Sequence, residues 1–183
     1  MMPNPAQIGS GPDKRVAIGL LVAIGACILY TSIRDPLEPQ NRFDDKPMQR
    51  SLVDPEFASA HEKARSTIEQ FIETMRQPMP NQDSFSIKTG IKYGERPEEI
   101  EYLWLQDLSY KDGVFAGIVS NLPEQATPIS FGDTMIAAKA DVVDWSYRQD
   151  GKTAGAFTIR VMRERLSPEQ QLEFDQEIQF FDP

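Results

Sequence analysis

The chain has 183 residues with 28 acidic and 19 basic side chains, one cysteine, one histidine and a net charge of −9. This acidic balance argues against nucleic acid as a partner, because nucleic-acid binding needs a basic face. With only Cys27 and His61, one chain lacks a Cys/His zinc site, a disulfide and a Ser-His-Asp or Cys-His pair, unless His61 itself serves. We therefore expect no metal site and no cofactor.

An uncharged apolar run over residues 16–33 follows a Pro/Gly/Asn-rich tail, residues 1–15, which we expect to be disordered. Lys14 and Arg15 precede the run and Arg34 follows it. As a helix the run would reach about 27 Å, close to the hydrocarbon thickness of a bilayer. The sequence therefore predicts a single-pass anchor in the cytoplasmic membrane, with the membrane as a partner of residues 16–33.

Two other interpretations of the run remain open. The first is a signal peptide cleaved before Cys27, which would leave a lipidated cysteine. The second is a buried core helix. Residues 28–30 continue the apolar run past the cysteine, which favours the uncleaved anchor. Lys14 and Arg15 favour a cytoplasmic amino end, and long domains cross largely regardless of charge, so we expect a periplasmic domain.

Residues 34–53 contain three prolines among polar side chains and predict an extended stalk. The remainder, residues 54–183, predicts one α+β domain. We expect an antiparallel sheet of about five or six strands, built from two Asp-Gly hairpins and flanked by an N-terminal and a C-terminal helix.

The first helix of this domain has a clear start and end in the sequence. Asp54 can cap it and Pro55 suits its first position, while apolar residues follow at helical spacing from Phe57. It must end by Gln77, because Pro78 follows. His61 falls outside the apolar stripe, so we expect it to be solvated.

Alternating and apolar patterns predict six strands, over residues 85–91, 101–110, 115–120, 134–138, 141–147 and 155–162. Asp-Gly at 112–113 and at 150–151 predicts two hairpins, because a type I′ turn needs positive φ at both central residues.

The second hairpin has a predicted register that places Trp145 opposite Ala156 and Asp141 opposite Arg160. After it, residues 167–170, Ser-Pro-Glu-Gln, have the form of a capping box. They predict the final helix.

Several short motifs between residues 85 and 163 together resemble the YegJ-like family of bacterial proteins, also called domain of unknown function 2314. The motifs are Tyr-Leu-Trp-Leu at 102–105, Phe-Ala-Gly at 115–117, Asn-Leu-Pro at 121–123, Gly-Asp at 132–133, Asp-Trp at 144–145 and Gly-Ala-Phe-Thr-Ile-Arg at 155–160. Some family members begin with an export signal, which supports export here. The resemblance implies no activity and no catalytic residues. Where the family often has two glycines, this chain has Gly155-Ala156, which would narrow the room beside Trp145.

Two groups of residues are candidates for binding. Asp144, Trp145 and Arg160 would form a recognition patch, since Trp and Arg are enriched at binding hot spots. The alternative is that Trp145 fills the core and Arg160 pairs with a strand acid. In the long loop over residues 121–133, Ile129 and Phe131 would form an apolar binding rim unless they fold back onto the sheet.

These observations favour a membrane-tethered, non-catalytic binding module with a protein partner in the envelope. The alternative is a carboxylate-dependent envelope hydrolase, which needs a convergent acid pair with a raised pKa. Glu98, Glu99 and Glu101 are clustered in the sequence, but their spacing is not diagnostic. We therefore predict no catalytic residue.

Overall fold

The computed structural model describes residues 54–97, 99–126 and 128–183. The predicted tail, the anchor or signal segment at 16–33 with Cys27, and the stalk lie outside the described residues. Within the described ranges, no helix combines the length and the apolar character needed to cross a membrane.

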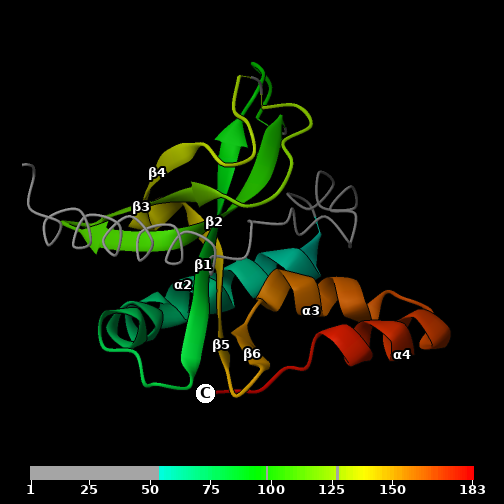
Figure 1. The fold of residues 1–183 in the computed structure, drawn as a ribbon. Helices are drawn as coiled ribbons and strands as arrows, with labels where there is room; N and C mark the ends of the chain where they lie inside the picture. The colour runs from blue at the N-terminus through cyan, green and yellow to red at the C-terminus, as the bar shows by residue number, and fades with distance from the viewer. Residues whose placement is uncertain (1–53, 98, 127) are drawn as a thin grey trace, which may run out of the picture. The chain divides into compact units, whose positions relative to one another are not determined.

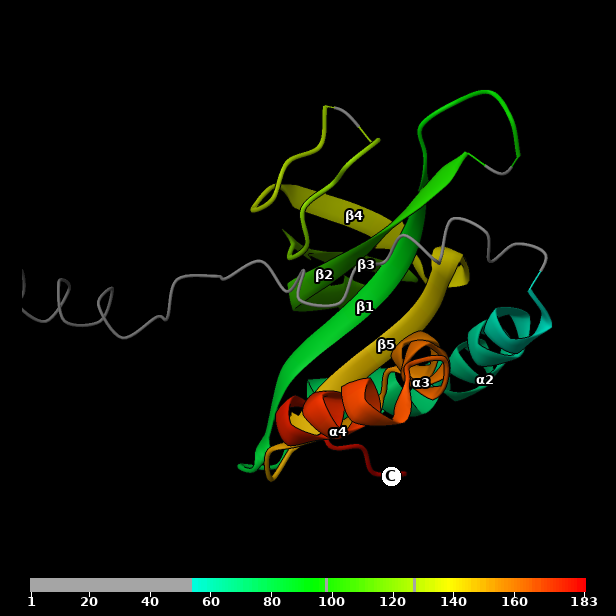
Figure 2. The ribbon, with the colours of Figure 1, turned by 90° about the vertical axis from the view of Figure 1, so that its right-hand side faces the viewer.

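The described domain is α+β, as the sequence predicts. Its elements in chain order are α2 (Pro55–Arg76), β1 (Gln82–Lys92), β2 (Ile100–Lys111), β3 (Val114–Val119), β4 (Thr134–Ala138), the 3₁₀ turn η2 (Lys139–Asp141), β5 (Val142–Gln149), β6 (Lys152–Gly155), α3 (Phe157–Glu164) and α4 (Pro168–Glu177). The strands form one antiparallel sheet in the order β4-β3-β2-β1-β5-β6. Figures 1 and 2 show α2 and α3 side by side next to β5.

Helix α2 begins and ends as predicted. The Asp54 carboxylate accepts a hydrogen bond from the Glu56 N–H at 3.1 Å, and the helix ends at Arg76, two residues before Pro78. The expectation for His61 is wrong, since its side chain is buried and lies 5.8 Å from the Tyr102 ring. Because α2 contacts both the sheet and α3, its buried face is wider than the single stripe.

The main core lies between α2 and the sheet, and Trp145 is its largest buried side chain. The indole stacks on Phe71 at 5.2 Å between ring centroids. Its N–H donates to the Ala64 carbonyl and the Thr67 hydroxyl, each at 3.1 Å. The indole is therefore both packed and hydrogen-bonded, as a buried Trp requires.

The chain between β5 and β6 turns at Asp150 and Gly151, which both have positive φ and lie between paired Gln149 and Lys152. Between β2 and β3, residues 112 and 113 also both have positive φ, and they lie between the paired residues 111 and 114. Positive φ at both central positions is the backbone geometry of a type I′ turn.

The predicted strand over 155–162 is wrong, because β6 ends at Gly155 and α3 follows from Phe157. Gly155 and Ala156 have φ of 67° and 52°, so the backbone leaves the extended conformation at this point. Arg160 therefore lies on a helix and not opposite Asp141. The apolar residues at 157 and 161 are four apart, a spacing that also fits one face of a helix.

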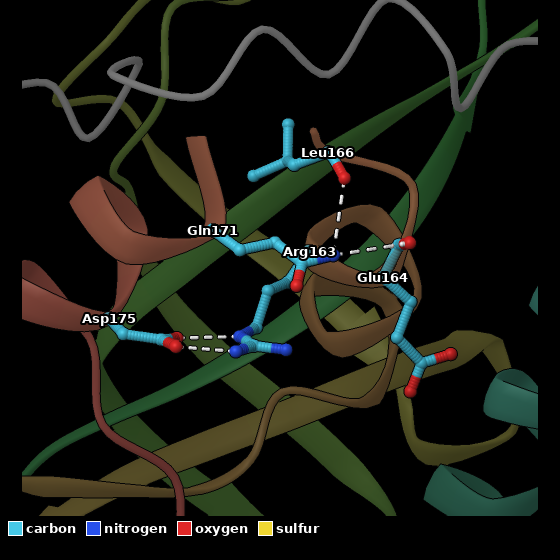
Figure 3. Close-up of polar contacts among 5 residues, drawn as sticks. All are labelled: Arg163, Glu164, Leu166, Gln171 and Asp175. Carbon is cyan, nitrogen blue, oxygen red and sulfur yellow. Dashed lines mark hydrogen bonds and ion pairs between the residues drawn. The ribbon is translucent and has the colours of Figure 1, made fainter. Parts of the chain in front are cut away.

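Helix α4 has the predicted capping box at Ser167 and Gln170. Figure 3 shows how α3 and α4 are joined: the Arg163 guanidinium binds both carboxylate oxygens of Asp175. The Gln171 amide donates to the Leu166 carbonyl at 3.1 Å. These contacts fix the two helices to each other at the surface.

Candidate functional site

Asp144 is the central polar residue of the first candidate patch, and it caps helix α3. Its side chain is fully buried. One oxygen accepts the N–H groups of Trp145 at 2.8 Å and Phe157 at 3.0 Å. The other accepts the N–H of Thr158 at 2.8 Å and its hydroxyl at 2.6 Å. A carboxylate at the start of a helix satisfies N–H groups that have no intrahelical acceptor.

Electrostatics around Asp144 act in both directions. Burial raises the pKa of the Asp144 carboxyl, while the hydrogen bonds from Thr158 and the nearby Lys88 charge oppose that rise. Lys88 lies opposite Asp144 in the β1–β5 pairing. It is also buried, with its ammonium 5.3 Å from the centre of the Trp104 ring. Sequence analysis missed Lys88, because alternation alone does not separate a buried lysine from a solvated one.

Arg160 fastens the C-terminal segment to α3. Its guanidinium donates to the carbonyls of Gly155 at 2.9 Å and Phe181 at 2.8 Å, and it pairs with Asp182 at 3.2 Å. It also stacks over the Phe180 ring at 4.6 Å. The acid that pairs with Arg160 therefore belongs to the C-terminal segment and not to a strand.

Asp144, Trp145 and Arg160 meet around the start of α3, but they do not form an open patch. Asp144 and Trp145 are buried, while Arg160 is half-buried. Beside them, α2 and α3 border an open groove of about 420 Å³, whose lining includes Lys63, Phe157 and Arg160. The Lys63 ammonium lies 5.1 Å from the centre of the Phe157 ring.

The clustered acids of the sequence diverge in the structure. Glu101 is buried, and its carboxylate accepts the backbone N–H groups of Glu124, Gln125 and Ala126 at 2.6–2.9 Å. It therefore holds the loop that follows β3. Glu99 instead binds the Arg96 guanidinium at 2.7 Å, which holds the pKa of the Glu99 carboxyl below its usual range.

Among residues 54–97, 99–126 and 128–183, no three His, Cys, Asp or Glu side chains are grouped to hold a metal ion. Glu98 lies outside the described residues.

The second candidate site is the loop between β3 and β4. Ile129 packs against the main core, whereas Phe131 is half-buried and Leu122 is 48% exposed. We call Leu122, Ile129 and Phe131 the apolar rim. Two contacts hold the loop: the Glu101 carboxylate accepts the backbone N–H groups of residues 124–126, and the Asn121 side chain accepts the Trp104 N–H at 2.7 Å. The backbone that carries these apolar side chains is therefore held in place by hydrogen bonds.

The edge strand β4 is a feature that sequence analysis did not single out. Ile136 is 71% exposed and lies opposite Ala116, while Val114 is 40% exposed and lies opposite Ala138. Met135 and Ala137 face the core instead. The outer surface of β3 and β4 therefore carries apolar side chains next to the loop of the rim.

The described α+β domain matches a family of proteins conserved in bacteria. Residues 54–181 match the family model described as "Uncharacterized protein conserved in bacteria (DUF2314)". The chain belongs to this family, which confirms the resemblance to YegJ-like proteins.

Two relatives define the similarity further. The chain is 33% identical over 102 residues to "Uncharacterized protein YegJ" of Escherichia coli, covering 56% of this chain and 63% of that protein. It is 30% identical over 132 residues to a "Putative ankyrin repeat protein" of Neisseria meningitidis, covering 68% of this chain and 52% of that protein. The chain thus spans less than two thirds of the length of each relative. No solved structure matches it.

Proposed function

We propose that this protein is a membrane-tethered binding module of the bacterial envelope. Residues 16–33 hold it in the cytoplasmic membrane, and the domain over 54–183 binds a protein partner in the periplasm. The observation that carries the proposal is the apolar rim, in which Leu122 is exposed and Phe131 is half-buried on an anchored loop, because loops on a rigid scaffold and exposed apolar side chains commonly form recognition surfaces. Within the rim, Leu122 and Phe131 would contact the partner, and Ile129 would fix the loop to the core.

The surroundings of the buried acids also support binding over catalysis. Asp144 and Glu101 each accept backbone N–H groups through both carboxylate oxygens. A carboxylate that caps a helix or holds a loop stabilises the fold in its ionised form. Protonating it, as general acid catalysis requires, would weaken these hydrogen bonds. Both side chains are buried, so neither faces a polymer substrate at the surface.

The proposal is tested by recovering partners of the full-length, tagged protein from membranes of its own bacterium after mild cross-linking. Leu122→Ser combined with Phe131→Ser should reduce a specific co-purified envelope protein at least tenfold. Leu172→Ser is the matched control, because Leu172 is 67% exposed on α4. The wild-type protein, the rim variant and Leu172→Ser should have the same melting temperature within a few degrees, as measured by circular dichroism.

Three results would overturn the proposal. The first is an unchanged set of partners in the rim variant. The second is hydrolysis of an envelope polymer by the purified protein, abolished by a single acid-to-amide substitution, which would establish the hydrolase instead. A collapse of the melting temperature in the rim variant alone would assign Leu122 and Phe131 to the core and remove the rim as a binding surface.

A further inference from the structure

Among the described residues, strand β4 forms one edge of the sheet, and its only protection against pairing is its short length. It pairs only with β3 among the described strands. Its five residues, Thr-Met-Ile-Ala-Ala, include no charge and no proline, and Ile136 at its centre is 71% exposed. Natural sheets usually blunt such edges with lysine, proline or a bulge. An unprotected edge is a template for a strand from another chain.

The backbone of β4 presents its free groups in a symmetric pattern. The Lys139 N–H donates to the Gly113 carbonyl, and the Asp133 carbonyl accepts the Val119 N–H, each at 2.9 Å. The backbone N–H and C=O groups at the odd-numbered positions of β4 thus point toward β3. Because this direction alternates along an antiparallel strand, the N–H and C=O groups at 134, 136 and 138 point outward. These positions are evenly spaced about Ile136.

We propose that β4 pairs with β4 of a second copy of this chain, antiparallel, around a two-fold axis at Ile136. Each Ile136 would then lie opposite the partner's Ile136, and each Thr134 opposite the partner's Ala138. All three outward residues of each copy gain backbone hydrogen bonds. The contact is isologous, so it closes as a dimer and does not propagate.

Charges at the two ends of β4 favour this register. In it, Asp133 lies opposite the partner's Lys139, and the same pair repeats at the other end. Asp133 and Lys139 flank β4 at odd-numbered positions, as do Met135 and Ala137, which pack against the core. The Asp133 carboxylate accepts the Ser130 N–H at 2.8 Å, and Lys139 binds Glu69 of α2. Opposite charges directly across two strands stabilise the pair, and like charges destabilise it.

Other pairings lose these contacts between opposite charges. A parallel arrangement would place Asp133 beside the partner's Asp133 and Lys139 beside the partner's Lys139. A two-residue slip would leave both charges without an opposite partner and would pair fewer outward residues. A strand of five residues buries less area than the roughly 1,200 Å² of a stable interface. The dimer should therefore be weak and reversible, and it is best detected by trapping.

The first test traps the dimer through Ile136 in the full-length chain. Cys27→Ser removes the native cysteine, and Ile136→Cys places one thiol at the two-fold axis. A hydrogen-bonded antiparallel pair has Cα atoms about 5.5 Å apart, within the range that a disulfide spans. Mild oxidation should give at least ten times more disulfide dimer than Cys27→Ser with Leu172→Cys. Equal yields would overturn the proposal.

The second test uses charge exchange in the Cys27→Ser, Ile136→Cys background. Asp133→Lys alone and Lys139→Asp alone should each lower the dimer yield at least tenfold, because like charges then meet at both ends. Mixing the two variants should restore it as a heterodimer, since both ends again pair opposite charges. Undiminished yields in the single variants, or no heterodimer on mixing, would overturn the proposed register. Leu122, Ile129 and Phe131 are kept in every variant, and only Asp133→Lys removes a contact in their loop, the hydrogen bond from the Ser130 N–H. The Ile136→Cys and Lys139→Asp results therefore fail independently of the rim proposal.

Discussion

Removing the Asp144 carboxylate should uncap α3 and strongly destabilise the domain. In Asp144→Ala, the N–H groups of Trp145, Phe157 and Thr158 lose their acceptor. A buried donor left without a partner costs about 1–3 kcal/mol. We take the low end of this range for each of the three N–H groups. Three donors then give a loss of about 3 kcal/mol in the free energy of unfolding.

Urea unfolding of the full-length protein, followed by far-UV circular dichroism, measures this loss. Asp141→Ala is the matched control, because Asp141 lies three residues earlier and its side chain is exposed; its effect should stay within about 0.5 kcal/mol. Asp144→Asn keeps one carbonyl oxygen and should fall between the two. If Asp144→Ala and Asp141→Ala differ by less than about 0.5 kcal/mol, the capping role of Asp144 is refuted.

Three further predictions concern the fold and its location. Gly155→Ala should destabilise the domain more than Gly113→Ala, by at least about 2 kcal/mol. Both glycines have positive φ, but a Cβ at position 155 would lie 2.3 Å from the Trp145 carbonyl oxygen, whereas a Cβ at position 113 would have no atom within 4 Å. Equal losses of stability in thermal unfolding would disprove the clash. Burial lowers the pKa of His61 from 6.5 to about 4, so the unfolded chain takes up a proton first as pH falls. Stability should decline from pH 6.5 toward pH 4 by about 3 kcal/mol. His61→Leu should remove that part of the decline, and identical pH profiles would count against it. Protease added to spheroplasts should digest residues 54–183, whereas protection until lysis would place the domain in the cytoplasm. An altered processing pattern or lost lipid labelling in Cys27→Ser would replace the uncleaved anchor with a lipoprotein.

Local signals in the sequence were sufficient for the elements with clear ends. Asp54 and Pro55 set the start of α2, the capping box sets the start of α4, and the short run that follows Gly132 and Asp133 gives β4 its bounds of Thr134–Ala138. Each signal depends on neighbours within a few residues, so no knowledge of the tertiary structure is needed.

Helix α3 could not be predicted, because its start depends on a distant residue. Asp144 lies thirteen positions before Phe157, yet it supplies the acceptor for the first N–H groups of the helix. Residues 157–161 also alternate between apolar and polar side chains over a short span, as a half-buried strand does. The pattern alone therefore favoured a longer hairpin.

The candidate site was predictable only in part, for a similar reason. Trp145 and Arg160 stand out in the sequence, but the burial of Trp145 and the partners of Arg160 depend on tertiary packing, which spacing along the chain does not encode. The exposure of Ile136 also follows from its place on an edge strand, which requires the strand order of the sheet.

The central claim, that the apolar rim contacts an envelope protein, is tested most directly by photocrosslinking in living cells. A photoreactive amino acid is placed at Leu122 of the full-length protein, and in a parallel strain at Leu172 as the equally apolar, exposed control. Our account predicts a discrete cross-linked product with one envelope protein from position 122 and none from position 172. No product from position 122, or the same products from both positions, would contradict it.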